Sequence, residues 1–214
     1  MSNDTDDLTQ QNEVVYNIVT VGDSAVGKTC IVNRFLGRPF AITHLTTIGI
    51  DKSTYKIERD GINYVMKFWD TTGQERFANL AGQYFRKADY VCFVYAINDI
   101  KTFESITKWL NNLKNVNNNS RLRMALIGNK SDLENERTVT KENGEAKAKE
   151  LQMTFFETSA KMETGIKECF NYIINEVIEA NLDKARKKMQ TITLDDVKHK
   201  DGGCCGDNKK KNKK

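Results

Sequence analysis

The chain has 214 residues, of which 39% are hydrophobic, enough for one core followed by a tail. Residues 181–214 hold 11 Lys/Arg and 5 Asp/Glu (+6), so residues 1–180 carry −2 of the net +4. This division argues against a nucleic-acid-binding body and predicts a basic tail able to contact an anionic surface. No apolar run approaches the roughly 20 residues of a membrane-spanning helix, and the acidic N-terminus does not resemble a signal peptide.

Strand-like and helix-like stretches alternate along the chain. The predicted strands are Val14–Val21, 50–58, 62–69, Tyr90–Ala96, Met124–Gly128 and Met153–Glu157. The predicted helices are Gly27–Leu36, 79–87, 103–115, 140–151 and 164–186. The alternation indicates an α/β fold, a mainly parallel sheet covered by helices on both faces, and the turn signal Asp60-Gly61 predicts a hairpin with one antiparallel edge strand.

We expect three regions. Residues 1–12 form a flexible N-terminus, residues 13–188 form the domain, and residues 189–214 form a disordered basic tail rich in Gly, Asn, Asp and Lys. Cys30, Cys92 and Cys169 lie among apolar residues and are expected to be reduced thiols.

Residues 22–29 match the phosphate-binding pattern G-x-x-x-x-G-K-[ST], between a predicted strand and a predicted helix. Glycines let successive backbone N–H groups face phosphate oxygens, Lys28 brings positive charge, and the Thr29 hydroxyl can ligate Mg²⁺. The residues expected at the phosphates are Asp23, Ser24, Ala25, Val26, Gly27, Lys28, Thr29 and Cys30. The loop alone does not distinguish ATP from GTP, or a kinase from a switch.

A second motif favours guanine. Asn129-Lys130-Ser131-Asp132 directly follows a predicted strand, at the end where parallel sheets bind nucleotides. The Asp132 carboxylate can accept from guanine N1–H and the 2-amino group, donors that adenine lacks on that edge. Near the last strand, Ser159, Ala160 and Lys161 could bring the Ala160 N–H to guanine O6. The alternative is a Lys/Asp surface turn and a polar strand end.

With these motifs in order, residues 14–180 resemble the Ras superfamily of small GTPases and look most like a Rab. The supporting segments are Thr47–Asp51, which reads TIGID, and Trp69–Phe77, which reads WDTTGQERF. The resemblance implies a six-stranded sheet, five helices and two mobile switches. It also implies that effectors read the switches, and that the chain serves vesicle-mediated membrane traffic.

The resemblance assigns further site residues. Thr47 would ligate Mg²⁺ when the γ-phosphate is present, and Asp70 would hold Mg²⁺ through water. Gly73 would donate its N–H to the γ-phosphate, and Gln74 would orient the attacking water. Phe40 falls where the family stacks an aromatic ring on guanine; the alternative is a loop anchor in the core.

The sequence departs from the family at Thr72, where alanine is usual, and at Lys52, where Rabs usually have phenylalanine. Thr72 adds a hydroxyl and a β-branch beside Gln74, so the geometry of this switch is expected to differ from the family's. Lys52 is expected to make the effector-facing surface unusual. Residues 43–46 hold no arginine where GTPases with a built-in arginine finger carry it, so we expect slow hydrolysis that needs an activating protein.

Two rival readings are a GTP-binding scaffold with little or no turnover, and a phosphate-loop ATPase or small-molecule kinase. Asn129–Asp132 disfavours the second.

Cys204 and Cys205 in the basic tail suggest double lipidation, since two lipid chains anchor stably and one does not. Nine residues with five lysines follow Cys205, unlike prenylated Rabs, and the last four residues contain no cysteine for a C-a-a-X box. The alternative is two unmodified cysteines in a solvated linker. We expect the protein in the cytosol and on the cytoplasmic face of endomembranes. Its expected partners are an exchange factor, an activating protein, effectors, an escort and prenylation machinery, and a GDP-dissociation inhibitor.

Overall fold

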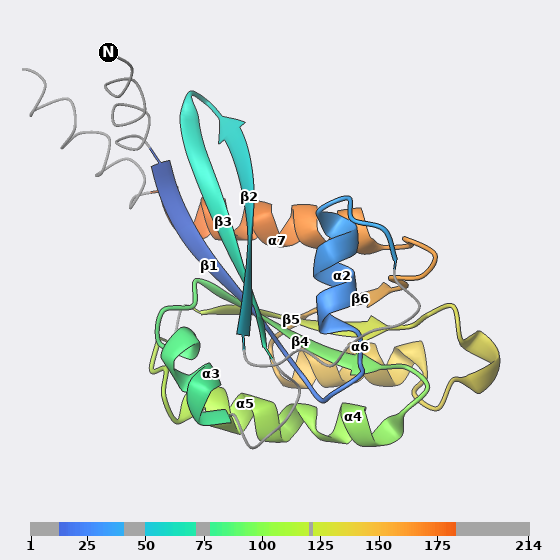
Figure 1. The fold of residues 1–214 in the computed structure, drawn as a ribbon. Helices are drawn as coiled ribbons and strands as arrows, with labels where there is room; N and C mark the ends of the chain where they lie inside the picture. Colours follow the sequence, from blue (N-terminus) through green and yellow to red (C-terminus); the bar gives the residue numbers. More distant parts are fainter. Residues whose placement is uncertain (1–12, 41–49, 72–77, 120–121, 183–214) are drawn as a thin grey trace, which may run out of the picture. The chain divides into compact units, whose positions relative to one another are not determined.

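Six strands form one sheet in the order β2-β3-β1-β4-β5-β6 (Figure 1). The strands are β1 (Glu13–Val21), β2 (Ile50–Arg59), β3 (Ile62–Thr71), β4 (Tyr90–Ala96), β5 (Arg123–Asn129) and β6 (Thr154–Thr158). β4 pairs in parallel with β1 and β5, and β5 with β6, whereas β2 runs antiparallel to β3. This confirms the predicted mostly parallel sheet with one antiparallel edge strand.

The computed structural model describes residues 13–40, 50–71, 78–119 and 122–182; the side chains of residues 50 and 78–81 are not among the described ones. Val14–Ala180 forms one compact unit.

The helices cover both faces of the sheet. They are α2 (Lys28–Phe35), α3 (Ala78–Phe85), α4 (Ile100–Glu104), α5 (Ile106–Lys114), α6 (Lys141–Glu150) and α7 (Ile166–Ala180), with a short 3-10 turn, η2 (Glu134–Glu136). In Figure 1, α2 and α7 lie above the sheet, and α3, α4, α5 and α6 lie below it.

The hairpin between β2 and β3 turns at Asp60 and Gly61, as predicted. Both residues have positive φ, 53° and 73°, the combination that a two-residue type I′ turn requires. The ten pairs of the hairpin run from Ile50 opposite Thr71 to Arg59 opposite Ile62. This register fixes Lys52 directly opposite Trp69 and brings both to the same face of the ribbon.

An aromatic cluster joins α2, β3 and α7. Phe170 of α7 stacks on Phe35 of α2 with ring centroids 4.7 Å apart, and meets Phe68 of β3 edge-on at 5.4 Å. Apolar residues on α7 recur every three or four positions, which directs one stripe into the core. Aromatic pairs at these separations add to the stability given by burial of the rings.

On the opposite face of the sheet the core is mainly aliphatic. β1 and β4 contribute Val19, Val21 and Phe93, and the helices contribute Trp109 and Leu113. All seven residues of β4 are buried, as expected for a central parallel strand covered on both sides.

One predicted helix differs from the observed structure. The pattern predicts a single helix over 103–115, whereas two helices, α4 and α5, meet at Ser105. α4 begins earlier because Asp99 caps it, its side chain accepting a hydrogen bond from the Lys101 N–H. The last predicted helix is α7, and residues 183–186 of the prediction lie outside the described part of the chain.

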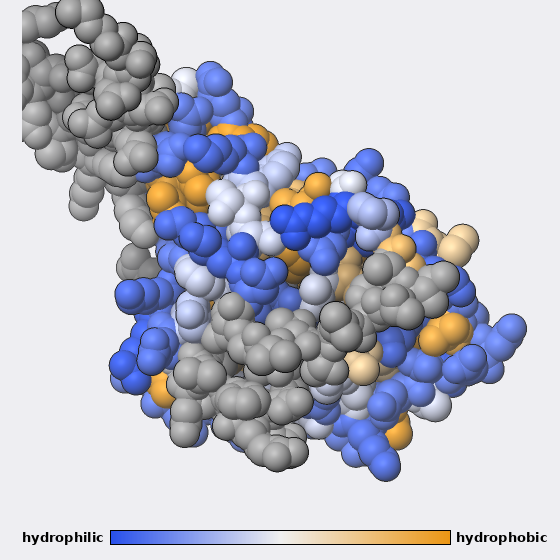
Figure 2. Space-filling model, viewed as in Figure 1, coloured by the Kyte–Doolittle hydropathy of each residue, from blue (hydrophilic) through white to orange (hydrophobic). Residues whose placement is uncertain are grey.

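On the face seen in Figure 2, hydrophobic residues form small separate patches among hydrophilic ones. Among the described residues of Val14–Ala180, the large hydrophobic residues that are exposed are Ile100, Met162 and Tyr172. Among the residues that the structure describes, no helix has both the length and the apolar character needed to cross a membrane.

Candidate functional site: a nucleotide-binding edge of the sheet

The loop from Gly22 to Gly27 leaves the carboxyl end of β1 and leads into α2. Gly22 has φ 144°, and a Cβ there would lie 2.1 Å from the Val94 carbonyl oxygen of β4. Gly27 has φ 97° and stands at the N-cap of α2, where it makes no side-chain capping hydrogen bond, and the N-terminus of a helix favours an anion. The loop therefore approaches its neighbours too closely for side chains at these two glycines.

Lys28 is buried at the start of α2, with 5% of its surface exposed. Its Nζ donates to the carbonyl oxygens of Gly22 at 3.0 Å and Asp23 at 2.8 Å, so the ammonium group is held across the mouth of the loop. Burial lowers the pKa of Lys28 to about 8, although Asp70 and Asp23 oppose the shift. A phosphate bound here would add negative charge beside the buried ammonium group and favour its charged form.

Thr29 and Asp70 meet beside this loop. The Thr29 hydroxyl donates to Asp70 Oδ2 at 2.5 Å, and the Thr20 hydroxyl donates to Asp70 Oδ1 at 3.4 Å. Burial raises the pKa of Asp70, with partial compensation from these hydroxyls and Lys28. A buried carboxylate beside a hydroxyl is a set of hard oxygen donors, which suits a divalent cation such as Mg²⁺. The residues present therefore fit the expected metal.

Asn129 connects the two predicted motifs. Its Nδ2 donates to the Val26 carbonyl of the phosphate loop at 2.8 Å. Its Oδ1 accepts from the Thr158 hydroxyl at 3.2 Å and from the Ala160 N–H at 3.4 Å. Only 1% of Asn129 is exposed, so these bonds are shielded from water. One amide thus holds the phosphate loop, the end of β5 and the segment after β6 together.

Asp132 faces the segment that follows β6. Its Oδ1 accepts from the Ser159 hydroxyl at 2.6 Å, and its Oδ2 lies 4.0 Å from the Lys161 ammonium group. The Ser159 hydroxyl also accepts from the Met162 N–H. Lys130 has φ 67°, a left-handed conformation that turns the chain sharply before Asp132. The residues predicted to read guanine are thus brought together.

The structure adds a contact that the sequence does not indicate. The Trp109 indole N–H of α5 donates to Asp23 Oδ1 of the phosphate loop at 2.8 Å. The side chain of Asp23 is therefore turned toward α5, and Asp23 can contribute its backbone to a phosphate. The two residues lie 86 positions apart, and no local pattern could have linked them.

The remaining predicted site residues divide into two groups. Ser24 and Ala25 are exposed on the phosphate loop, and Cys30 and Phe40 are half-buried. Thr47, Gly73, Gln74, Cys204 and Cys205 lie outside the described residues, as does Thr72. The roles predicted for them stay predictions.

Apart from the nucleotide site, Trp69 of β3 and Tyr84 of α3 are in contact, with ring centroids 4.6 Å apart. They line a pocket of about 360 Å³ together with Asn17, Gln83, Arg86 and Lys87. Asn17 Oδ1 accepts from the Trp69 indole N–H at 2.9 Å. Lys52, the departure noted in the sequence, is exposed opposite Trp69 in the hairpin register.

Comparison with known proteins identifies the family. The model of the Ras family matches residues 17–179. The chain belongs to the Ras family. It is 36% identical over 187 residues to the human (Homo sapiens) Ras-related protein Rab-15, covering 87% of this chain and 86% of that protein.

Two further relatives agree. The Ras-related protein Rab-10 of Diplobatis ommata is 40% identical over 167 residues, covering 78% of this chain and 83% of the relative. The Ras-related protein Rab-13 of Rattus norvegicus is 38% identical over 164 residues, covering 77% and 80%. This Ras-family member is therefore a Rab-like small GTPase of membrane traffic that binds guanine nucleotide and hydrolyses GTP to GDP.

Proposed function

We propose that this GTPase is a switch with slow intrinsic turnover, in which Asn129 holds the nucleotide-binding loops in their working arrangement. The observation that carries the proposal is the set of bonds from one buried amide to Val26, Thr158 and Ala160. Phosphates would bind the backbone of residues 23–30 and Lys28. Guanine would bind Asp132, with support from Ser159, Ala160, Lys161, Lys130 and Phe40.

Mg²⁺ would be held by Thr29 and, through water, by Asp70, with Thr47 joining when GTP is bound. When bound, Mg²⁺ would supply positive charge against the phosphates. The hydroxyl of Thr29 donates to the Asp70 carboxylate, and a bound cation would take the place of this hydrogen bond.

Hydrolysis would follow in-line attack of water on the γ-phosphorus. Gln74 orients the water, the Gly73 N–H binds the γ-phosphate, and Lys28 stabilises the charge that develops on it. Residues 43–46 supply no arginine, so one stabilising charge is missing from the chain itself. An arginine finger is worth about 10³–10⁵ in rate, and we propose that an activating protein completes the site.

The rival within the same family is a scaffold that holds GTP without meaningful turnover, favoured only by Thr72 beside Gln74. Single-turnover hydrolysis of GTP by the pure protein with Mg²⁺ separates the two. We expect slow but measurable hydrolysis in the parent, and a further loss in Gln74→Leu with GTP binding retained.

Gln83→Leu is the matched control, because Gln83 is an exposed glutamine on α3 away from the phosphates. It should hydrolyse GTP like the parent. Absence of turnover in the parent would favour the scaffold. Parent-like turnover in Gln74→Leu would contradict the role given to Gln74.

We further propose that the basic tail attaches the protein to the cytoplasmic face of endomembranes. Lipid chains on Cys204 and Cys205 would supply the anchor, and nearby lysines would add about 1 kcal/mol each against anionic lipids. An exchange factor, an activating protein, a GDP-dissociation inhibitor and an escort for prenylation would then govern its cycle. Effectors would meet Lys52 on the surface beside Trp69, where the family usually offers phenylalanine.

A further inference from the structure

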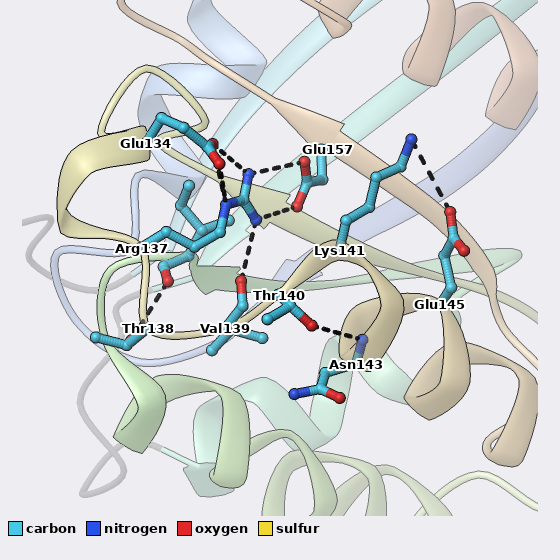
Figure 3. Close-up of polar contacts among 10 residues, drawn as sticks. Glu134, Arg137, Thr138, Val139, Thr140, Lys141, Asn143, Glu145 and Glu157 are labelled. Carbon is cyan, nitrogen blue, oxygen red and sulfur yellow. Dashed lines mark hydrogen bonds and ion pairs between the residues drawn. The ribbon is translucent and has the colours of Figure 1, made fainter.

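One arginine outside the predicted site is bonded on three sides (Figure 3). The Arg137 Nε donates to both carboxylate oxygens of Glu134 at 2.9 Å, and Nη2 donates to Glu134 Oε2 at 2.8 Å. Its Nη1 and Nη2 donate to the two oxygens of Glu157 at 2.7 and 3.1 Å, and Nη1 also reaches the Val139 carbonyl at 3.0 Å. The guanidinium is therefore fixed in position and orientation.

The two carboxylates come from segments that adjoin the base-binding residues. Glu134 lies two positions after Asp132, in η2. Glu157 lies two positions before Ser159, on β6. Arg137 therefore ties together the chain leaving the first guanine motif and the chain entering the second.

Backbone bonds connect the same segment to β5. The Thr138 and Val139 N–H groups donate to the Ile97 carbonyl at 2.9 and 3.0 Å, and the Ile97 N–H donates to the Asn129 carbonyl at 3.0 Å. Hydrogen bonds thus connect the Arg137 segment to Asn129 through Ile97. The Ser159 hydroxyl, which donates to Asp132 at 2.6 Å, adds the segment after β6 to the same network.

The ion pair between Arg137 and Glu157 is largely buried, unlike an ordinary surface ion pair. The side chains of Arg137 and Glu157 are 14% and 16% exposed, whereas Glu134 is 68% exposed. Exposed ion pairs contribute little, but removing one partner of a mostly buried pair leaves a charge without compensation. Loss of Arg137 would therefore displace Glu157 and with it the end of β6.

We propose that Arg137 is a positioning residue for the guanine base: it holds Asp132 and the Ser159–Lys161 segment in register. This positioning slows the dissociation of bound nucleotide and increases the selectivity for guanine over other bases. The inference rests on the proposed guanine site. Arg137 itself does not contact the nucleotide, and it acts through Glu134 and Glu157.

Two nucleotides test the inference, GDP and inosine diphosphate, whose base lacks the 2-amino group that Asp132 would bind. Dissociation of fluorescent derivatives of both is measured from the parent and from Arg137→Leu. We expect GDP to leave Arg137→Leu about tenfold faster, an effect of the size found within bonded networks. The preference for GDP over inosine diphosphate should shrink by several-fold, and Arg137→Lys should fall between the two proteins.

The matched control is Arg123→Leu. Arg123 forms an ion pair with Glu176 from the start of β5, the opposite end of that strand from Asn129. Arg123→Leu should release GDP and inosine diphosphate at the rates of the parent and show the same preference between them. If Arg137→Leu does not fold, Glu157→Gln removes the charge without removing the shape and allows the same comparison.

Unchanged release in Arg137→Leu would overturn the inference. Equal acceleration of GDP and inosine diphosphate would do so as well, because a merely structural role loosens both nucleotides alike. Failure of the parent to bind GDP is a different outcome, and would reject the proposed function instead.

Discussion

Gly27 and Gly37 have the same unusual backbone in different surroundings. Gly27 has φ 97° and Gly37 has φ 76°. A Cβ on Gly27 would lie 2.2 Å from Asn129 Nδ2, whereas a Cβ on Gly37 would meet nothing within 4 Å. Both would incur the left-handed backbone cost, but only Gly27 would also collide with the amide that joins the nucleotide loops.

We therefore expect Gly37→Ala to lower the free energy of unfolding by about 1–2 kcal/mol. Gly27→Ala should lower it by a further 1–3 kcal/mol, roughly the cost of overpacking, and should also weaken GDP binding. Urea unfolding and GDP titration of both variants measure these effects. Equal losses of stability in the two variants would contradict the contact with Asn129.

At the residue scale, the sequence predicted which residues form the nucleotide site but not the long-range hydrogen bonds that position them. Residues 22–29 and 129–132 follow strands in recognisable patterns, because phosphate and guanine each impose local spacing. The bond from Trp109 to Asp23 and the one from Asn129 to Val26 span 86 and 103 positions. Such contacts depend on which strands become neighbours, and that information is not local.

Among the elements, α7 shows how one helix face carries stability. Phe170 is fully buried between Phe35 and Phe68, whereas Tyr172, two positions later, is 40% exposed. Residues two apart on a helix point in different directions, so Phe170 faces the core and Tyr172 faces solvent.

Phe170→Ala should lower the free energy of unfolding by about 3–5 kcal/mol, because it leaves a cavity among three elements. Tyr172→Ala should cost about 1 kcal/mol or less, as expected for a partly exposed side chain. Chemical denaturation of the two variants under identical conditions makes the comparison. A cost for Tyr172→Ala that matched Phe170→Ala would mean that the aromatic cluster does not dominate this face.

Element types were predictable wherever pattern and burial agree. The run at Tyr90–Ala96 has no polar break and becomes the fully buried β4. The break between α4 and α5 was not predicted, because apolar residues continue on both sides of Ser105 without Gly or Pro. The capping bond at Asp99 depends on backbone geometry and left only a weak signal in the sequence.

At the scale of the whole molecule, the site joins the ends of β1, β3, β5 and β6 through Lys28, Asp70, Asn129 and Ser159. A ligand that bridges these ends stabilises the folded state by mass action. Saturation at 1,000 times the dissociation constant is worth about 4 kcal/mol. Nucleotide binding therefore raises the free energy of unfolding.

We expect GDP with Mg²⁺ to raise the melting temperature of the protein, and removal of Mg²⁺ by EDTA to reverse part of the rise. ADP at the same concentration should give little change, because its base offers Asp132 no paired donors. Differential scanning calorimetry follows all three conditions. An equal rise with ADP would contradict the role of Asp132 and return the phosphate-loop ATPase to consideration.

The bond between Trp109 and Asp23 has an optical consequence. The chain has two tryptophans, and each indole N–H is fixed: Trp109 to the phosphate loop at 2.8 Å, and Trp69 to Asn17 at 2.9 Å. Trp69 also directly precedes Asp70 on β3. Of the two indoles only that of Trp109 is bonded to the phosphate loop, so a change in tryptophan emission on nucleotide binding should be lost in Trp109→Phe and kept in Trp69→Phe.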